Sequence, residues 1–180
     1  MNFRESILSM AGYTPGEQPQ DGRYIKLNTN ENPYPASPNV FEAIRKALDR
    51  GLQKYPDALA TPFRTAASKV LGVEPDWILA GNGSDDILTI ITRAFVDPGD
   101  VVCYPRPSYV LYAVLAQLQG ARSREIPFTA DWRLDDSLLT DQERLRLVYL
   151  PNPNSPTGTV IPPNEIGGIT VPVGLFGFGR

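Results

Sequence analysis

Apolar residues recur every three or four positions in two early stretches of the chain, which is the spacing of one face of an α-helix. The first stretch predicts a helix that begins with Ser37 as its N-cap and ends at Gly51. The second predicts a helix that is capped by Thr61 and ends at Gly72. Glycine and proline interrupt every period in residues 1–36, which are therefore expected to form an irregular arm.

From residue 77 onward, short apolar runs alternate with helical periods. The apolar runs predict strands at residues 77–80, 101–104, 122–126 and 145–150. One helical period lies between the runs at 77–80 and 101–104, and another covers residues 109–118. This alternation predicts an α/β fold in which a mostly parallel sheet is flanked by helices. Ligands of such sheets bind beyond the C-terminal ends of the strands.

Composition narrows the class of protein. The chain has 180 residues, of which 42% are hydrophobic and 21% charged, an ordinary balance for a globular domain with a core. Its net charge of −3 gives no basic surface for nucleic acid. No apolar run approaches the roughly 20 residues that span a bilayer, and the N-terminus lacks the apolar centre of a secretion signal. We therefore expect a cytoplasmic protein with neither a nucleic-acid nor a membrane partner.

The scarcity of certain side chains limits the chemistry. Histidine is absent, which excludes Ser-His-Asp and Cys-His triads and the usual zinc sites. Cys103 is the only cysteine and lies in an apolar run, so a buried, unreactive thiol is expected and no metal site is predicted. An enzyme built from this chain would use Lys, Tyr, Asp or Glu, or a cofactor.

A glycine-rich turn joins the run at 77–80 to the next helical period. Its sequence is Gly81-Asn82-Gly83-Ser84-Asp85-Asp86. Glycine lets the backbone turn sharply, and the first N–H groups of the helix have no partner within it, so the turn is a candidate anion site. The two carboxylates can point away while their amides donate. The alternative is that Ser84 or Asp85 simply caps the helix. The spacing fits neither G-x-G-x-x-G nor a Walker loop.

Two more segments follow predicted strands and are expected at the same edge of the sheet. One is the Tyr-Pro-Arg-Pro-Ser-Tyr segment that ends at Tyr109, and the other is the Asn- and Pro-rich loop of residues 151–158. An anion cradle, an aromatic ring and hydrogen-bonding amides together suit a flat, phosphorylated aromatic cofactor. The amide-rich stretch of residues 28–32 either closes turns on its own backbone or lines a polar pocket.

Five of these segments occur in an order that resembles a known family. They are Leu27–Pro33, Lys54–Asp57, Gly81–Asp86, Pro105–Tyr109 and Pro153–Gly158. Together they resemble the histidinol-phosphate aminotransferase branch of the fold-type I, pyridoxal-phosphate-dependent aminotransferases (classes I and II), over about residues 25–166. The resemblance implies an arm of residues 1–36 on the substrate side and a partial cofactor-binding domain over residues 37–166. Residues 167–180 form a Gly-rich tail that does not fit the family.

The resemblance implies roles for particular residues. The backbone amides of Gly83, Ser84 and Asp85 would bind the phosphate of pyridoxal 5'-phosphate, and Tyr109 would stack on its ring. Tyr55 would reach the cofactor phosphate of the neighbouring subunit in a homodimer.

Other implied roles concern the ring hydroxyl of the cofactor and the substrate. Many relatives place an Asn immediately before the Pro of the Asn-Pro-Thr-Gly loop as the partner of that hydroxyl. Here the position is Ser155, with Asn154 one residue earlier, so either side chain is a candidate. Asn30, Glu31 and Asn32 would lie near the substrate.

The implied reaction belongs to histidine biosynthesis. It transfers an amino group from histidinol phosphate to 2-oxoglutarate, giving imidazole acetol phosphate and glutamate. An aromatic or other amino-acid aminotransferase is the alternative within the family, since these share most of the motifs. The substrates are in every case a small-molecule amino donor and a 2-oxo acid.

The resemblance also implies residues that this sequence lacks. In the family, the Schiff-base lysine, the Asp that pairs with the pyridinium nitrogen and the carboxylate-binding Arg all follow the Asn-Pro-Thr-Gly loop. None of the four lysines, at positions 26, 46, 54 and 69, has the family position, so no catalytic residue is predicted. We therefore expect a chain whose resemblance to the family is truncated after about residue 166, with either an altered reading frame or a truncated gene as the origin of the tail.

Two alternatives of other classes follow. The first is a catalytically silent fragment, at most a phosphate- or cofactor-binding module, whose unpaired sheet edges would make it poorly soluble. The second, a generic Rossmann-type nucleotide domain, is weaker because the glycine spacing is wrong for it.

Overall fold

The computed structural model describes residues 3–10, 22, 24–27, 31–135, 137, 145–162 and 164. The chain divides into two compact units. The sheet unit comprises Met1–Tyr13 and Gly81–Arg180, and the helical unit comprises Thr14–Ala80. Within the described ranges, no helix is long and apolar enough to cross a membrane. The tail of residues 167–180, which the sequence analysis singled out, lies outside the described residues.

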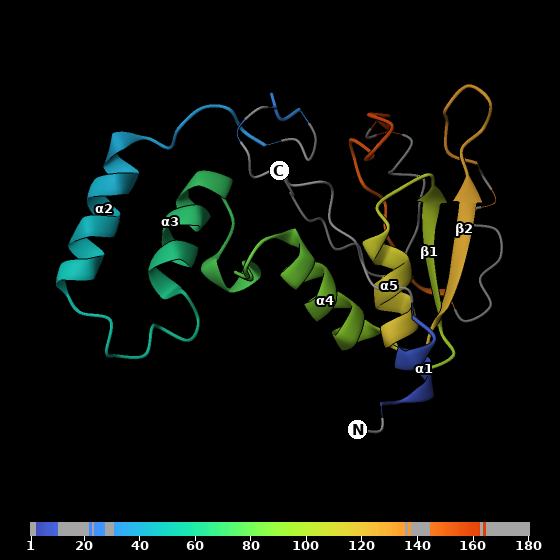
Figure 1. The fold of residues 1–180 in the computed structure, drawn as a ribbon, viewed down its shortest axis with the longest axis horizontal. Coiled ribbons are helices and arrows are strands. Elements are labelled where there is room, and N and C mark those ends of the chain that lie inside the picture. The colour runs from blue at the N-terminus through green and yellow to red at the C-terminus, as the bar shows by residue number, and fades with distance from the viewer. Residues whose placement is uncertain are drawn as a thin grey trace. The chain divides into compact units, whose positions relative to one another are not determined.

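A three-stranded parallel sheet forms the centre of the sheet unit (Figure 1). The strands are β1 (Val101–Arg106), β2 (Arg122–Pro127) and β3 (Leu145–Val148), in the order β2-β1-β3. Strand β1 is parallel to both neighbours, so the C-terminal ends of β1 and β3 lie at one edge. This confirms the predicted α/β fold with a parallel sheet.

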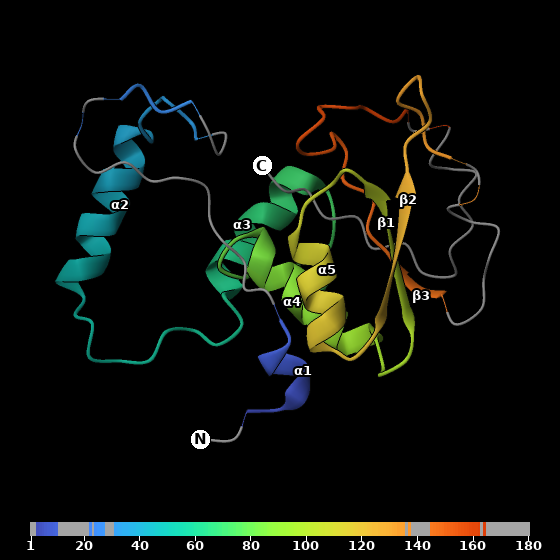
Figure 2. The same ribbon diagram turned by 45° about the vertical axis from the view of Figure 1, so that its right-hand side comes forward.

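Helices α4 (Ser84–Phe95) and α5 (Leu111–Leu118) lie side by side against the sheet (Figures 1 and 2). Helix α4 is joined to β1 by a short turn, where Asp100 N–H donates to the Asp97 carbonyl. The helix therefore runs against the strand direction, and its N-terminus lies at the edge where the strands end. The short helix α1 (Glu5–Leu8) contacts α5, so the arm predicted to be irregular contains one helical turn.

Tyrosines dominate the core between the helices and the sheet. Tyr112 of α5 stacks on Tyr149, with ring centroids 4.5 Å apart, and also packs against Tyr104 of β1. The Tyr149 hydroxyl is satisfied by Thr92 and by the Leu88 carbonyl of α4. The core thus joins helices α4 and α5, strand β1 and the residue after β3, and the polar tip of Tyr149 finds partners on α4.

The opposite face of the sheet holds a smaller cluster around Cys103 and Ile126. Cys103 is fully buried, and burial raises the pKa of its thiol while Arg124 opposes part of that rise. A buried neutral thiol is a poor nucleophile, which confirms the expectation of an unreactive cysteine.

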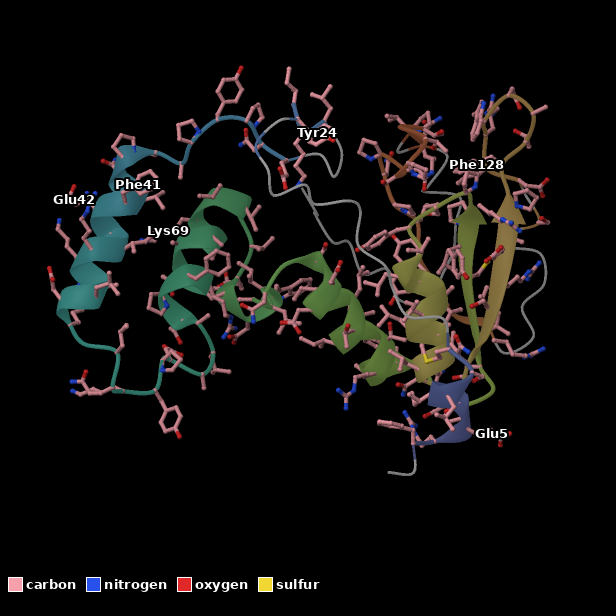
Figure 3. The ribbon with its side chains drawn as sticks, viewed as in Figure 1. Glu5, Tyr24, Phe41, Glu42, Lys69 and Phe128 are labelled. Carbon is pink, nitrogen blue, oxygen red and sulfur yellow. The ribbon has the colours of Figure 1, made fainter. Side chains whose placement is uncertain are left out.

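The helical unit contains α2 (Pro38–Asp49), α3 (Thr61–Leu71) and the 3-10 turn η1 (Pro75–Trp77). None of its described residues is buried. In Figure 3, Phe41 and Glu42 project from opposite sides of α2, as expected for an amphipathic helix. The apolar stripe of α2 stays about half exposed, at 45% for Phe41 and 53% for Ile44. Its other large members are Val40 and Leu48.

Two local predictions in the helical unit are wrong. Ala60, not Thr61, is the N-cap of α3, because the Ala60 carbonyl accepts the first helical hydrogen bond, from Arg64 N at 3.0 Å. The amide of Leu59 and the side chain of Thr61 bond to the Asp57 carboxylate and lower its pKa. Residues 77–80 form no strand, since the amide of Trp77 closes the 3-10 turn on Glu74 at 2.9 Å.

The exposed stripe on α2 leads to a first prediction. Ile44→Glu should lower the fluorescence of bound anilinonaphthalene sulfonate, because it removes a large apolar side chain from the uncovered surface. It should change the free energy of unfolding by at most about 0.5 kcal/mol, since the side chain is not in a core. Arg45→Glu, a change on the polar face of the same helix, is the matched control. Equal dye binding by the two variants would contradict the uncovered stripe.

A second prediction concerns alkaline stability. Burial, followed by the neighbouring Tyr149 and Asp85, raises the pKa of Tyr112 from 10.0 to about 12. A raised folded pKa favours the neutral phenol, so this stabilisation is complete below pH 10 and is lost as the pH rises from 10 towards 12. Tyr112→Phe keeps the stacked ring and should remove about 2–3 kcal/mol of alkaline destabilisation, measured by urea unfolding at several pH values. Tyr24→Phe, which removes the hydroxyl of an exposed tyrosine in the helical unit, is the matched control.

Candidate functional site

The glycine turn ends at Gly83, which is the N-cap of α4 and adopts a φ of 83°. A Cβ at Gly83 would meet nothing within 4 Å, so the conformation, not crowding, favours glycine there. A Cβ at Gly81 would meet the Asp86 carboxylate at 2.8 Å. That carboxylate accepts from the amide of Asn82 at 2.9 Å and so folds the turn back on the helix.

The first turn of α4 has no side-chain cap. The alternative that Ser84 or Asp85 caps the helix therefore does not hold, since both residues lie inside the helix and Gly83 occupies the cap position. The leading amides stay available at the positive end of a 12-residue helix. This arrangement suits an anion that approaches over the open side of Gly83.

Tyr109 connects the loop after β1 to the glycine turn. Its hydroxyl donates to both carboxylate oxygens of Asp85, each at 3.1 Å. Its ring and that of Tyr112 form a T-shaped contact, with centroids 5.8 Å apart. The structure thus brings together the anion cradle and the aromatic residue that the sequence placed 24 positions apart.

Asn154 connects the loop after β3 to the loop after β1. Its side-chain nitrogen donates to the Pro107 carbonyl at 3.0 Å and to the Thr157 hydroxyl at 2.7 Å. Its side-chain oxygen accepts from the Ser108 hydroxyl at 2.8 Å. Because an amide nitrogen has two hydrogens, the donor capacity of Asn154 is fully used within the protein. Ser155, the next residue, is exposed.

A pocket of about 370 Å³ lies elsewhere in the sheet unit. It is lined by residues 131–134 and 159–162, and none of the residues predicted to form the site lines it. One lining residue, Thr159, also contacts Asn154: the backbone N–H of Asn154 donates to the Thr159 carbonyl at 2.8 Å. The edge formed by the glycine turn, Tyr109 and the 151–158 loop remains the candidate site.

The comparison with known proteins identifies the family of the chain. The family model for aminotransferase class I and II matches residues 23–171. The chain belongs to the class I and II aminotransferases.

Two curated relatives of this aminotransferase chain carry the same name. The chain is 50% identical over 167 residues to histidinol-phosphate aminotransferase of Rhodopirellula baltica, covering 92% of this chain and 46% of that protein. It is 46% identical over 159 residues to the enzyme of the same name from Geotalea daltonii, covering 88% and 45%. The chain thus spans about half the length of the curated relatives it matches.

A solved aminotransferase shares the fold. The crystal structure of histidinol-phosphate aminotransferase from Sinorhizobium meliloti in complex with pyridoxal-5'-phosphate matches with a TM-score of 0.80 at 30% identity. The match covers 93% of this chain and 47% of the other. The parallel sheet and its helices therefore correspond to part of an aminotransferase fold.

The remaining predicted site residues of this aminotransferase chain belong to the helical unit. Tyr55 is 99% exposed. Glu31 forms an ion pair with Lys26, and the side-chain oxygen of Asn32 accepts from the Tyr34 amide at 3.0 Å, which is a local turn closure. Asn30 lies outside the described residues. The roles of these residues toward a substrate or a second subunit stay predictions.

Sequence reasoning missed two features of the site. It treated Asn154 only as a possible cofactor ligand, whereas its side-chain nitrogen donates to Pro107 in the loop after β1 and to Thr157 in its own loop. It also assigned no partner to the Asp85 carboxylate, which accepts from Tyr109. The sequence carried a weak signal for Asn154, because a side-chain amide that becomes buried between two prolines must find hydrogen-bond partners within the protein.

Asn154 provides a third prediction. Asn154→Asp keeps the shape of the side chain but removes both donors, and it places an oxygen against the Pro107 carbonyl. The free energy of unfolding should fall by about 2–4 kcal/mol, since two buried hydrogen bonds are lost. Urea unfolding followed by fluorescence measures the change. Ser155→Ala, at the exposed neighbour, should stay within about 0.5 kcal/mol of the unsubstituted chain. A stable Asn154→Asp variant would contradict the locking role of Asn154.

Proposed function

We propose that this chain forms the cofactor-binding part of a pyridoxal-phosphate-dependent aminotransferase, most like histidinol-phosphate aminotransferase. One observation carries the proposal: the uncapped N-terminus of α4, the ring of Tyr109 and the exposed Ser155 belong to segments that meet at one edge of the sheet. The similarity to named histidinol-phosphate aminotransferases supports the choice within the family.

The residues present fit such a cofactor. The amides at Gly83, Ser84 and Asp85 would bind its phosphate, because no side chain caps them and the space over Gly83 is open. A phosphate there would gain both hydrogen bonds and the favourable end of the helix dipole. Tyr109 would offer a flat surface to the pyridine ring.

Ser155, rather than Asn154, is the donor we assign to the ring hydroxyl. The two hydrogens of the Asn154 amide are already donated to Pro107 and Thr157. Ser155 is exposed, so its hydroxyl can reorient toward a ligand without breaking a buried contact. Asn154 then acts indirectly: its hydrogen bonds hold the loop that carries Ser155 in place.

In the proposed reaction, an amino group passes from histidinol phosphate to 2-oxoglutarate. The bound cofactor supplies an electron sink for the carbon that loses its proton. The residues of this chain bind the phosphate, fix the tilt of the ring and hydrogen-bond its hydroxyl. An aromatic or other amino-acid donor is the alternative, because these site residues contact the cofactor rather than the donor side chain.

The remaining assignments are part of the same proposal. The arm of residues 1–36, with Asn30, Glu31 and Asn32, would lie toward the substrate. Tyr55, fully exposed in the helical unit, would contact the cofactor phosphate of a second subunit in a homodimer. The protein would act in the cytoplasm, where amino acids are made.

A second candidate function is cofactor binding without turnover by this chain. Its four lysines all fall within residues 14–80, and none of them is buried. Lys26 and Lys46 form ion pairs, with Glu31 and Glu42. Amine exchange with the cofactor requires a desolvated lysine, and a side chain that is not buried stays in contact with water. Borohydride reduction with pyridoxal phosphate and peptide mapping would test this: a single trapped lysine would overturn it.

The fourth prediction tests the proposed site with pyridoxamine 5'-phosphate, which has no aldehyde and cannot react with surface lysines. The chain should bind it at least about tenfold more tightly than pyridoxamine, because the phosphate occupies the α4 cradle. Ser155→Ala should weaken binding by roughly five- to tenfold through the lost hydrogen bond. Ser84→Ala should bind normally, since the backbone amide remains. Isothermal titration calorimetry gives each affinity.

Equal affinities for the phosphorylated and unphosphorylated probes would show that the α4 N-terminus is not the phosphate site. Unchanged binding by Ser155→Ala would overturn only the assignment of the ring-hydroxyl donor.

A further inference from the structure

Two acidic residues lie in the first turn of α4, and they have different partners. Asp86 accepts from the Asn82 amide and folds the glycine turn. Asp85 accepts the Tyr109 hydroxyl on both carboxylate oxygens at 3.1 Å, and the Ser84 hydroxyl only at 3.5 Å. The main hydrogen-bond partner of the Asp85 carboxylate is therefore Tyr109, which lies outside α4.

Tyr109 contacts other residues through both its ring and its hydroxyl. The ring meets that of Tyr112 in a T-shaped contact, at an interplanar angle of 87°. Tyr112 is itself stacked on Tyr149 in the buried core, so this support is rigid. The hydroxyl lies at the outer end of the ring. The bond from the Tyr109 hydroxyl to Asp85 fixes that outer end.

We propose that Asp85 is a positioning residue that sets the tilt of Tyr109 through its hydroxyl, so that the ring is presented flat to the pyridine ring of the bound cofactor. The inference rests on the proposed function, because it concerns the surface on which the cofactor would stack. It assigns the Asp85 side chain a role separate from that of its backbone amide at the phosphate.

Electrostatics makes this role testable, because charge alone predicts the opposite result. A carboxylate beside a phosphate site repels the phosphate, so removing it would tighten binding if charge were all that mattered. Removing a positioning residue weakens binding instead, because the ring must then be ordered when the ligand binds. The sign of the change therefore separates the two roles.

The fifth prediction uses the whole chain and pyridoxamine 5'-phosphate as the probe. Asp85→Ala and Tyr109→Phe should each weaken binding about fivefold, as expected for one charge-assisted hydrogen bond at a partly exposed position. The double variant should be no weaker than either single one, because both remove the same bond. Asp85→Asn keeps an acceptor oxygen without the charge and should recover part of the loss. The ring resonances of Tyr109 in carbon-labelled protein should shift in Asp85→Ala before any probe is added.

The possible outcomes separate the positioning role of Asp85 from the proposed cofactor site. Tighter or unchanged binding by Asp85→Ala, additive losses in the double variant, or equal affinities of Asp85→Asn and Asp85→Ala would overturn the positioning role and leave the proposed cofactor site standing. No binding by the unsubstituted chain would overturn the proposed function and this role with it. If Asp85→Ala fails to fold, Tyr109→Phe alone decides, because it removes a single oxygen: unchanged binding would refute the inference.

Discussion

The parallel pairing of β1 with both neighbours is the constraint on which the candidate site depends. Parallel strands end at the same edge of a sheet, so the segments after β1 and β3 must emerge together. Helix α4 precedes β1 and runs against it, which brings its N-terminus to that edge as well. Three segments that are far apart in sequence therefore meet because the direction of three strands is fixed. No local preference of those segments would bring them together.

Buried polar groups then hold the edge in one arrangement. Asn154 is only 2% exposed, so its amide must be satisfied inside the protein, and it finds Pro107, Ser108 and Thr157. An unsatisfied amide at this position would cost about 1–3 kcal/mol, which is why the two loops are bound to one another so firmly. In the tyrosine core, stacked rings pack the helices against the sheet, and the Tyr149 hydroxyl bonds to Thr92 and to the Leu88 carbonyl of α4.

The cradle also shows how an anion site can contain acidic residues. Two carboxylates in the first turn favour the helix because they face its positive end. Each is occupied by a neighbour, Asp86 by the Asn82 amide and Asp85 by Tyr109. The backbone amides of the same residues stay available. The Asp86 side chain shapes the glycine turn and the Asp85 side chain holds Tyr109, while the backbone amides are available to bind the ligand.

The amino-acid sequence by itself determined the helices α2, α4 and α5, the parallel sheet, the buried Cys103 and the glycine turn at a helix start. These depend on hydrophobic periodicity and on backbone freedom, which act between residues a few positions apart. It failed at the cap of α3 and at residues 77–80, where a turn closed by Glu74 and Trp77 removed an amide from strand pairing. Only the tertiary structure decided the partners of Asp85 and Asn154. Those bonds join residues 24 and 46 positions apart, and they form because strand direction and burial bring the groups together.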